Sequence, residues 1–230
     1  MTNPTPLHER LRPYRHWLYT LLLPLYLIGF FLIERLVDGS SPYFVSYLPL
    51  DDRIPFCEWF VIFYVLWYPF MGAVGVYLAC KEPPCFKRYM SYIGATFLSS
   101  LLLFAVFPNG QDLRPALETL GRDNVATQVI GGIYTADTNT NVCPSIHVVG
   151  SIAAVFGILH SERLRRCRWV CIGGCVLAAL ICASTVLIKQ HSILDVLIGV
   201  TYALAFYPLV YRPSRIKSLQ TEKNARLTKE

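Results

Sequence analysis

Six runs of apolar residues constrain the fold more than any other feature of this chain. About 20 apolar residues in a helix are enough to cross the hydrocarbon core of a bilayer. The runs cover residues 17–37, 57–79, 89–107, 143–160, 168–188 and 191–211, five of them long and one shorter. Only 16% of the residues are charged, against roughly 25% in an ordinary soluble domain. We therefore predict an all-α integral membrane protein, a six-helix bundle without a separate soluble domain.

The positions of the positive charges predict how these helices are oriented. Most of the 21 Lys and Arg residues lie in four clusters, at residues 10–15, 81–88, 163–168 and 212–229. The connections that alternate with the clusters hold only Arg53, Arg114, Arg122 and Lys189. The positive-inside rule then places both termini in the cytoplasm.

Three parts of the chain follow from this orientation. We read residues 1–16 as a cytoplasmic arm, residues 17–211 as the transmembrane domain and residues 212–230 as a basic cytoplasmic tail. The net charge of +6 is explained by topology and by contacts with anionic lipids, so we do not expect a nucleic-acid partner.

The eight cysteines do not predict a metal site. Cys167, Cys171 and Cys175 are four positions apart at a helix start, and none of the eight has a zinc-type spacing with partner histidines. We read them as small apolar helix residues and predict neither a metal nor another cofactor.

The stretch from Ser184 to Asp195 carries the strongest chemical signal. His191 and Asp195 are four positions apart, so on a helix they share one face and the carboxylate can orient the imidazole. We expect the sixth helix to begin at His191. An unpaired carboxylate one turn inside such a helix costs about 3 kcal/mol, so we expect Asp195 to have a partner.

A second histidine opens the fourth run, in the sequence Pro144-Ser145-Ile146-His147. Proline is favoured at the first helical position, so we expect the fourth helix to begin at Pro144. The positive end of a helix start attracts phosphate. Ser145 and His147 are then expected at the same membrane boundary as the C-terminal histidine.

Two loops are expected on that same side. Residues 111–141 form the longest polar stretch, and loops of this length are often functional. It contains Arg114, while Lys189 lies just before the sixth run. The loop at residues 39–55 carries Asp51 and Asp52, which we interpret as solvated.

Taken together, these residues resemble the type 2 phosphatidic acid phosphatase superfamily, which also includes vanadium haloperoxidases and sphingolipid headgroup transferases. Its pattern is K-x6-R-P, then P-S-G-H, then S-R-x5-H-x3-D. The likeness extends from about Phe107 onward. The matching residues are Arg114-Pro115, Pro144-Ser145-Ile146-His147, and Ser184-Thr185 followed by His191 and Asp195.

This resemblance implies roles for the candidate residues. His191 is the expected nucleophile that becomes phosphohistidine, with Asp195 holding its attacking tautomer, and His147 is the expected general acid and base. The expected phosphate-binding residues are Arg114, Ser145 and Ser184, with Lys189 as a further candidate. The active site is expected at the extracytoplasmic ends of the fourth to sixth helices, acting on a phospholipid or prenyl-phosphate substrate in the bilayer.

The chemistry is reasonable without the resemblance. A neutral imidazole attacks phosphorus when its other nitrogen is tied to a carboxylate, and a second histidine can move the proton at neutral pH. Cations and helix ends can absorb the developing charge without a metal.

Three positions depart from the superfamily pattern. Phe107 stands in place of its lysine, Ile146 in place of its glycine and Thr185 in place of its arginine. Two cations of the expected phosphate-binding site are therefore missing. Lys189 either replaces one of them or lies at the membrane–water interface. A charge contact at about 4 Å is worth roughly 4 kcal/mol at an effective dielectric near 20, so this pocket should favour a singly charged phosphodiester over a dianionic monoester.

Three classes of function stay open from the sequence. The leading hypothesis is a metal-independent lipid phosphatase or phosphotransferase, including a sphingomyelin-synthase-like headgroup transferase. The second is a catalytically weak phospholipid-binding membrane protein, because the phosphate cradle departs at three points. The third is a proton-coupled transporter that uses the intramembrane His and Asp, which leaves the Arg-Pro and Pro-Ser-x-His sequences unexplained.

Overall fold

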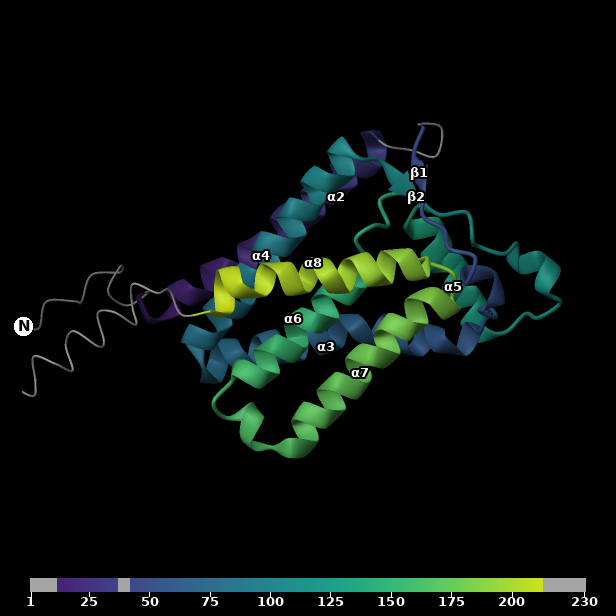
Figure 1. The fold of residues 1–230 in the computed structure, drawn as a ribbon. Coiled ribbons are helices and arrows are strands. Elements are labelled where there is room, and N and C mark those ends of the chain that lie inside the picture. Colours follow the sequence, from purple (N-terminus) through teal and green to yellow (C-terminus); the bar gives the residue numbers. More distant parts are fainter. Residues whose placement is uncertain (1–11, 37–41, 213–230) are drawn as a thin grey trace, which may run out of the picture.

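The computed structural model describes residues 12–36 and 42–212, which form a bundle of long helices (Figure 1). The bundle consists of η1 (Arg12–Leu21), α2 (Leu22–Leu36), α3 (Val61–Lys81), α4 (Pro83–Val106), α6 (Ile146–His160), α7 (Arg168–Leu187) and α8 (Ile193–Tyr211). The shorter elements are β1 (Phe44–Val45), η2 (Asp51–Arg53), η3 (Glu58–Phe60), β2 (Asn109–Gly110), η4 (Leu117–Leu120), α5 (Val125–Ala136) and η5 (Leu164–Arg166). The all-α prediction is confirmed.

Five helical segments are long and apolar enough to cross a membrane, as is typical of a membrane protein. They are Tyr14–Leu36, Glu58–Lys81, Pro83–Val106, Arg168–Leu187 and Ile193–Tyr211. They correspond to five of the six predicted spans. The predicted fourth span contains α6, which has only 15 residues and is shorter than the roughly 20 residues that match the hydrocarbon thickness.

Helix α6 lies at the centre of the bundle and packs against α3, α4, α7 and α8. Small residues allow this close approach. A Cβ atom added to Gly150 would lie 2.7 Å from the ring of Trp67, and Ala153 and Ala154 are fully buried. The central helix therefore positions its first turn, which carries His147, inside the protein.

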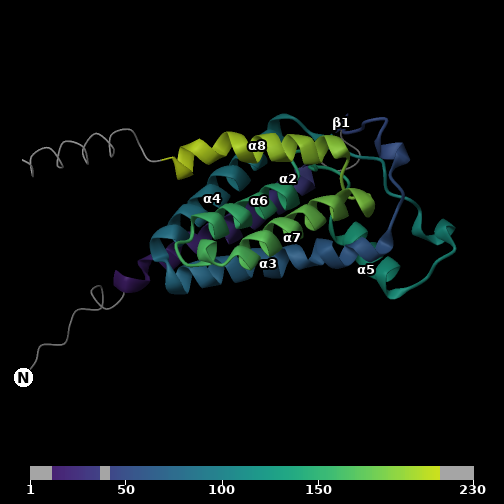
Figure 2. The same cartoon turned by 60° about the horizontal axis from the view of Figure 1, so that its bottom comes forward.

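Most residues outside the long helices lie at one end of the bundle, which we call the loop-rich end (Figure 2). Here β1 pairs in parallel with β2, Phe44 opposite Asn109 and Val45 opposite Gly110. At the opposite end, α3 turns into α4, and η5 joins α6 to α7 (Figure 1).

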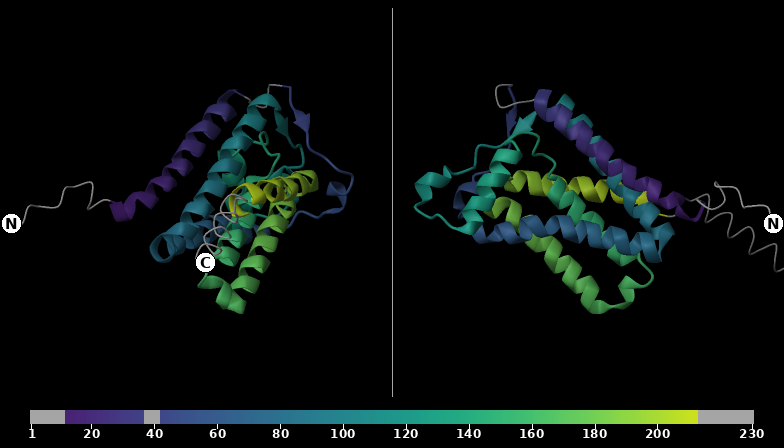
Figure 3. Two further views of the ribbon diagram at one scale, coloured as in Figure 1. Left: turned by 60° about the vertical axis from the view of Figure 1, so that its left-hand side comes forward. Right: turned by 180° about the vertical axis from the view of Figure 1, so that it is seen from behind.

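The N-terminal segment packs along α4 on one side of the bundle (Figure 3). Residues 12–16, which we predicted as part of the arm, belong to η1, and the ring of His16 is buried with Nε2 3.0 Å from the carbonyl oxygen of Ala79. Residues 1–11 of the predicted arm, Val37 of the first predicted span, and residues 213–230 of the predicted tail lie outside the described residues.

The predicted start of the fourth helix was wrong. Helix α6 begins at Ile146, with Ser145 at its N-cap, and Pro144 precedes it. The side chain of Asn109 holds this segment outside the helix, because it accepts a hydrogen bond from the backbone N–H of Cys143 and donates one to the carbonyl of the same residue.

The predicted start of the sixth helix was also wrong. Helix α8 begins at Ile193 and is preceded by a capping box, in which the hydroxyl of Ser192 accepts from Leu194 N–H and the carboxylate of Asp195 accepts from Ser192 N–H. Such a box satisfies N–H groups that have no partner within the helix. His191 therefore lies in the turn before the helix.

Candidate functional site

The turn between α7 and α8 fixes the position of His191. Lys189 has a left-handed backbone with φ of 55°, which reverses the chain direction at the end of α7. The N–H groups of Gln190 and His191 both donate to the carbonyl of Thr185, at 2.9 and 3.0 Å. These bonds hold the buried imidazole of His191 close to the last turn of α7.

The carboxylate of Asp195 lies beside this imidazole. Nδ1 of His191 is 3.4 Å from Oδ2 of Asp195, which is fully buried. The proximity agrees with the sequence prediction, but its cause differs from the predicted shared helix face. Asp195 faces the turn because the same oxygen accepts the capping hydrogen bond from Ser192 N–H at 2.9 Å.

The second histidine, His147, lies in the first turn of α6 and faces the same region. Its ring stacks on Tyr64, with centroids 4.1 Å apart, and contacts Trp67 at 4.5 Å. The ring centroids of His147 and His191 are 6.3 Å apart. The structure thus brings these two rings close together, while their shared catalytic role stays a prediction.

Both imidazoles line a cavity of about 340 Å³, which we call the histidine cavity. Residues of α2, α3, α5 and α6 and of the α7–α8 turn form its walls. Tyr64, Asp137 and Gln190 are among its polar lining residues, and the wall from α2 is mainly apolar. The two histidines therefore meet where polar and apolar surfaces adjoin.

Asp137 is a site residue that the sequence reasoning missed. It follows the last residue of α5, and its Oδ2 accepts a hydrogen bond from Gln190 Nε2 at 3.3 Å. Burial, together with the nearby charge of Glu34, raises the pKa of Asp137 from 3.8 to about 6, although His191 and Arg114 act in the opposite direction. A carboxyl group with a raised pKa thus lines the same cavity as the two imidazoles.

Asp51 is the second missed residue, and the interpretation of it as solvated was wrong. Its side chain is fully buried and accepts hydrogen bonds from Ser192 Oγ at 2.6 Å, Ile193 N at 2.9 Å and Leu48 N at 2.8 Å. A carboxylate is favoured there because a helix start presents free N–H groups and a positive dipole. Asp51 therefore fixes the α7–α8 turn from outside the cavity.

Two of the predicted phosphate-binding residues, Arg114 and Lys189, are engaged with backbone carbonyls. The Arg114 guanidinium donates to Tyr134 O at 3.1 Å and Thr138 O at 2.7 Å, and lies 4.5 Å from the centroid of the Tyr134 ring. The Lys189 ammonium donates to Asp51 O at 2.8 Å. Both cations lie close to the histidine cavity but do not line it.

The other two, Ser145 and Ser184, are fully buried serines at helix ends. Ser184 Oγ donates to Ile181 O at 2.6 Å within α7. Ser145 occupies the N-cap position of α6 without a capping hydrogen bond from its side chain, and its backbone N–H donates to Asp195 O at 3.4 Å. Contacts of these four residues with phosphate stay predictions.

Buried polar atoms without a hydrogen-bond partner among the described residues gather around the histidines. They include Arg114 Nε, Ser145 Oγ, His147 Nε2, Gln190 Oε1, His191 Nδ1 and Asp195 Oδ1, and also Trp67 Nε1 and Asn141 Oδ1 of the cavity lining. Ser46 Oγ and Tyr211 Oη also lack a partner among the described residues. Buried polar groups in proteins nearly always have a partner, so a cluster of such atoms indicates a place for a polar ligand. Among the described residues, no group of three or more His, Cys, Asp or Glu side chains is arranged to hold a metal ion.

The family model of the PAP2 superfamily matches residues 85–216, more than half of the chain. The chain belongs to the PAP2 superfamily. Neither the curated proteins nor the solved structures give a match to it. The PAP2 region contains all seven predicted site residues and Asp137, whereas Asp51 precedes it. Superfamily membership and the apolar helices fit a membrane phosphatase-like protein.

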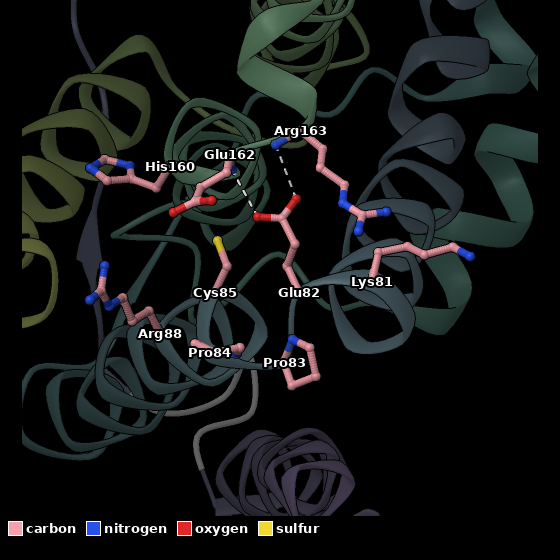
Figure 4. Close-up of a pocket in the computed structure, with 9 residues that line it drawn as sticks. All are labelled: Lys81, Glu82, Pro83, Pro84, Cys85, Arg88, His160, Glu162 and Arg163. Atoms are coloured by element: carbon pink, nitrogen blue, oxygen red, sulfur yellow. Dashed lines mark hydrogen bonds between the residues drawn. The ribbon is translucent and has the colours of Figure 1, made fainter. Parts of the chain in front are cut away.

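The PAP2 region also contributes to a second pocket, of about 380 Å³, at the opposite end of the bundle (Figure 4). The carboxylate of Glu82 accepts hydrogen bonds from Ser161 Oγ, Glu162 N and Arg163 N. The ring nitrogens of His160 lie 3.0 Å from Phe156 O and 3.1 Å from Tyr207 Oη. These polar groups already have partners within the protein, so we assign them a structural role.

Proposed function

We propose that this PAP2 protein is an integral-membrane, metal-independent lipid phosphatase or phosphotransferase that works through a phosphohistidine at His191. The observation that carries the proposal is the shared cavity, in which the imidazoles of His147 and His191 lie 6.3 Å apart with Asp195 3.4 Å from His191. A phosphorus centre bound between the two rings has a nucleophile on one side and a proton donor on the other.

The reaction needs two displacements at phosphorus. Asp195 keeps the proton on Nδ1 of His191, so that Nε2 presents its lone pair and forms the bond to phosphorus. The bond to the leaving oxygen breaks as that oxygen takes a proton from His147. His147 then accepts a proton from water or an alcohol, whose oxygen attacks phosphorus and releases His191.

The phosphoryl oxygens are held, in this proposal, by the four phosphate-binding candidates. The unpartnered Ser145 Oγ and Arg114 Nε support this assignment, since both are buried beside the histidines. The start of α6 adds backbone N–H groups and a positive dipole. Ser184 and Lys189 contribute by exchanging their present backbone partners for the substrate.

A second candidate function is headgroup transfer from a phosphodiester, as in sphingomyelin-type synthases. Asp137 favours this form of the reaction, because an ionised carboxylate in the cavity repels the second charge of a phosphomonoester. Phe107 and Thr185 stand at positions where the superfamily pattern has cations, and the Lys189 ammonium donates to Asp51 O. Fewer positive charges are thus left to bind the second negative charge of a phosphomonoester.

We also propose that the loop-rich end faces the extracytoplasmic side and that both termini are cytoplasmic. The supporting observation is that Lys81, Arg88 and Arg163 all line the second pocket, at the end away from the histidines. Cytoplasmic ends of membrane proteins are enriched in such cations.

The decisive experiment replaces His191 with Ala in the purified protein. Phosphate release from phosphatidic acid and from prenyl pyrophosphate, and headgroup transfer from phosphodiester lipids, should fall by about 10³-fold or more, as for other covalent nucleophiles. His160→Ala, a histidine of the second pocket, is the matched control and should keep its turnover within about twofold.

Other outcomes separate the competing functions. Unchanged turnover in His191→Ala would remove His191 from the mechanism. Tight binding of phosphatidic acid without product in the wild-type protein would favour the phospholipid-binding alternative. Proton-coupled solute uptake into sealed vesicles would favour a transporter.

A further inference from the structure

The histidine cavity adjoins a second, apolar cavity of about 330 Å³ that extends along the bundle between η1, α2, α3 and α4. The two cavities share four lining residues, Tyr26, Leu27, Trp67 and Tyr68. They therefore lie next to each other, and we call the two cavities together the α2–α3 groove. It runs from the two imidazoles towards the opposite end of the protein.

Helix packing explains why this groove exists. Both α2 and α3 pack on α4, so α4 forms the floor, and α2 and α3 diverge towards the loop-rich end (Figure 3). Two glycines of α3 leave space on this side of the groove, because they carry no side chain. A Cβ atom added to Gly72 meets nothing within 4 Å, and one added to Gly75 makes an ordinary contact of 3.4 Å with Tyr89.

The lining changes from polar to apolar along the groove. The end near the imidazoles contains Asp137 and Gln190, whereas the lining beyond Trp67 includes Met71, Val76 and Ile93. A ligand that fills the whole groove is charged at one end and hydrocarbon at the other, which is the chemistry of a phosphorylated lipid.

The length of the groove also fits a hydrocarbon chain. Tyr64 stacks on His147, and Val76 is twelve positions further along α3 and lines the apolar cavity. At a rise of 1.5 Å per residue the distance between these positions is about 18 Å. This exceeds half of the roughly 30 Å hydrocarbon thickness of a bilayer, so the groove can hold a chain along most of one leaflet.

We propose that one hydrocarbon chain of the phosphorylated lipid lies in the α2–α3 groove, and that Gly72 determines how long a chain is accepted. This inference rests on the function proposed above. Because the bilayer is as apolar as the groove, transfer of the chain gains little hydrophobic energy. Selectivity among lipids therefore depends on the shape of the groove. Gly72 has no side chain and leaves room for a long hydrocarbon chain, whereas a larger residue at this position would obstruct long chains but not short ones, which end before it.

Labelling tests the location of the chain without depending on turnover. The probe is phosphatidic acid with a diazirine at the end of one acyl chain, photolysed with the full-length protein in vesicles. We expect the label on α3 from Met71 to Val76 and on the facing residues of η1 and α2, and we expect unlabelled dipalmitoyl phosphatidic acid to compete. Label spread evenly over the lipid-facing helices, including α7, or label without competition, would overturn the proposal.

Kinetics with a graded series at Gly72 test the chain-length claim. In Gly72→Phe, kcat/KM for dipalmitoyl phosphatidic acid should fall roughly tenfold relative to dioctanoyl phosphatidic acid, as one misfit in an apolar pocket can cause. Gly72→Ala should give a smaller change in the same direction. The matched control is Gly173→Phe on α7, where an added Cβ also meets nothing within 4 Å.

The outcomes separate this proposal from the catalytic one. Equal effects of Gly72→Phe and Gly173→Phe on both chain lengths would refute the role of Gly72, and Gly72→Ala decides if the larger variant does not fold. His191→Ala should lose phosphate release and keep the labelling pattern. Retained phosphate release in His191→Ala refutes the mechanism alone, because the labelling still reports where the chain lies.

Discussion

The two ends of this protein carry cavities of similar size but different character. The histidine cavity has a volume of about 340 Å³ and the opposite pocket about 380 Å³. The opposite pocket is richer in formal charge, since Lys81, Arg88 and Arg163 line it with two glutamates. Its cations do not converge, because Lys81 and Arg163 extend to one side and Arg88 lies on the other (Figure 4).

The hydrogen bonds of the two cavities show the difference more clearly than their charges. Glu82 at the opposite pocket receives three hydrogen bonds from the protein. Around the histidine cavity, Ser145 Oγ, His147 Nε2 and Asp195 Oδ1 have no such partner among the described residues. Unsatisfied buried groups are thus concentrated around the histidine cavity, although Tyr211 Oη, whose ring centroid lies 4.4 Å from that of His160 near the opposite pocket, is also one of them.

Among variants at the two cavities, Asp195→Asn should lower turnover more than any other except the replacement of His191. An amide oxygen can still accept the capping bond from Ser192 N–H but cannot stabilise an imidazolium, so kcat should fall by about 10³-fold with little change in thermal stability. Steady-state turnover and the melting temperature in detergent measure the two effects. Unchanged turnover would show that Asp195 acts only as a helix cap.

Asp51→Asn should have the next largest effect. Asp51 does not line the histidine cavity, but its carboxylate accepts hydrogen bonds from Ser192 Oγ and Ile193 N at the start of α8. The amide cannot accept both equally well, and a hydrogen bond to a buried charged group is worth about 1.5–3 kcal/mol. We expect a lower melting temperature and a roughly tenfold lower kcat.

The matched control for this variant is Asp52→Asn. Asp52 is exposed and accepts a hydrogen bond from Tyr47 on the surface. A loss of turnover in Asp52→Asn equal to that in Asp51→Asn would show that the loop as a whole, and not the contact with α8, supports the site.

Asp137→Asn should change the pH dependence of stability. The pKa of Asp137 is raised from 3.8 to about 6, so the folded protein favours the protonated form and wild type loses stability as pH rises from about 4 through 6. The variant lacks this titration. Above pH 6 its free energy of unfolding should therefore exceed that of wild type, by at most about 3 kcal/mol. Melting temperatures measured from pH 4 to pH 8 check the sign.

The same variant sharpens the comparison of substrates. Removal of the carboxylate charge should raise turnover of a phosphomonoester relative to a phosphodiester by a few fold at pH 7. Asp112→Asn, at an exposed aspartate that accepts a hydrogen bond from Tyr43 Oη, is the control. A parallel change in both variants would mean that net charge of the loops, and not the position of Asp137, sets the preference.

Glu82→Gln should have the smallest effect on activity. The Glu82 carboxylate joins the α3–α4 turn to the α6–α7 connection, so the variant should melt at a lower temperature while turnover stays within about twofold. A loss of turnover as large as that of Asp51→Asn would contradict the structural role assigned to the opposite pocket.

The long apolar helices could be predicted because their signal is local. Runs of about 20 apolar residues indicate spans without knowledge of what they contact. The exception, α6, shows the limit of this rule. The run from Cys143 to His160 was counted as one helix, but Asn109, which is 34 positions from Cys143, holds the first residues outside it. The local sequence around Cys143 does not predict this contact.

The candidate site could be predicted only in part, for the same reason. His147 and His191 were placed at one boundary by charge bias and by their spacing from other motif residues. Asp51 and Asp137 were missed because their partners lie 141 and 53 positions away. The capping box at α8 had a readable signal, since Ser192 is followed three positions later by Asp195.

The hydrogen bonds of Asp51 have a consequence for synthesis of the protein. Ribosomes make the chain from its N-terminus, so the first loop is complete long before the 141 positions that separate Asp51 from Ser192 have been translated. Until residues 192 and 193 have been made and α8 has been inserted, the Asp51 carboxylate lacks the hydrogen bonds that Ser192 Oγ and Ile193 N donate to it. A truncated translation product that ends before residue 191 therefore lacks both the nucleophile proposed above and the contacts of Asp51 that fix the α7–α8 turn.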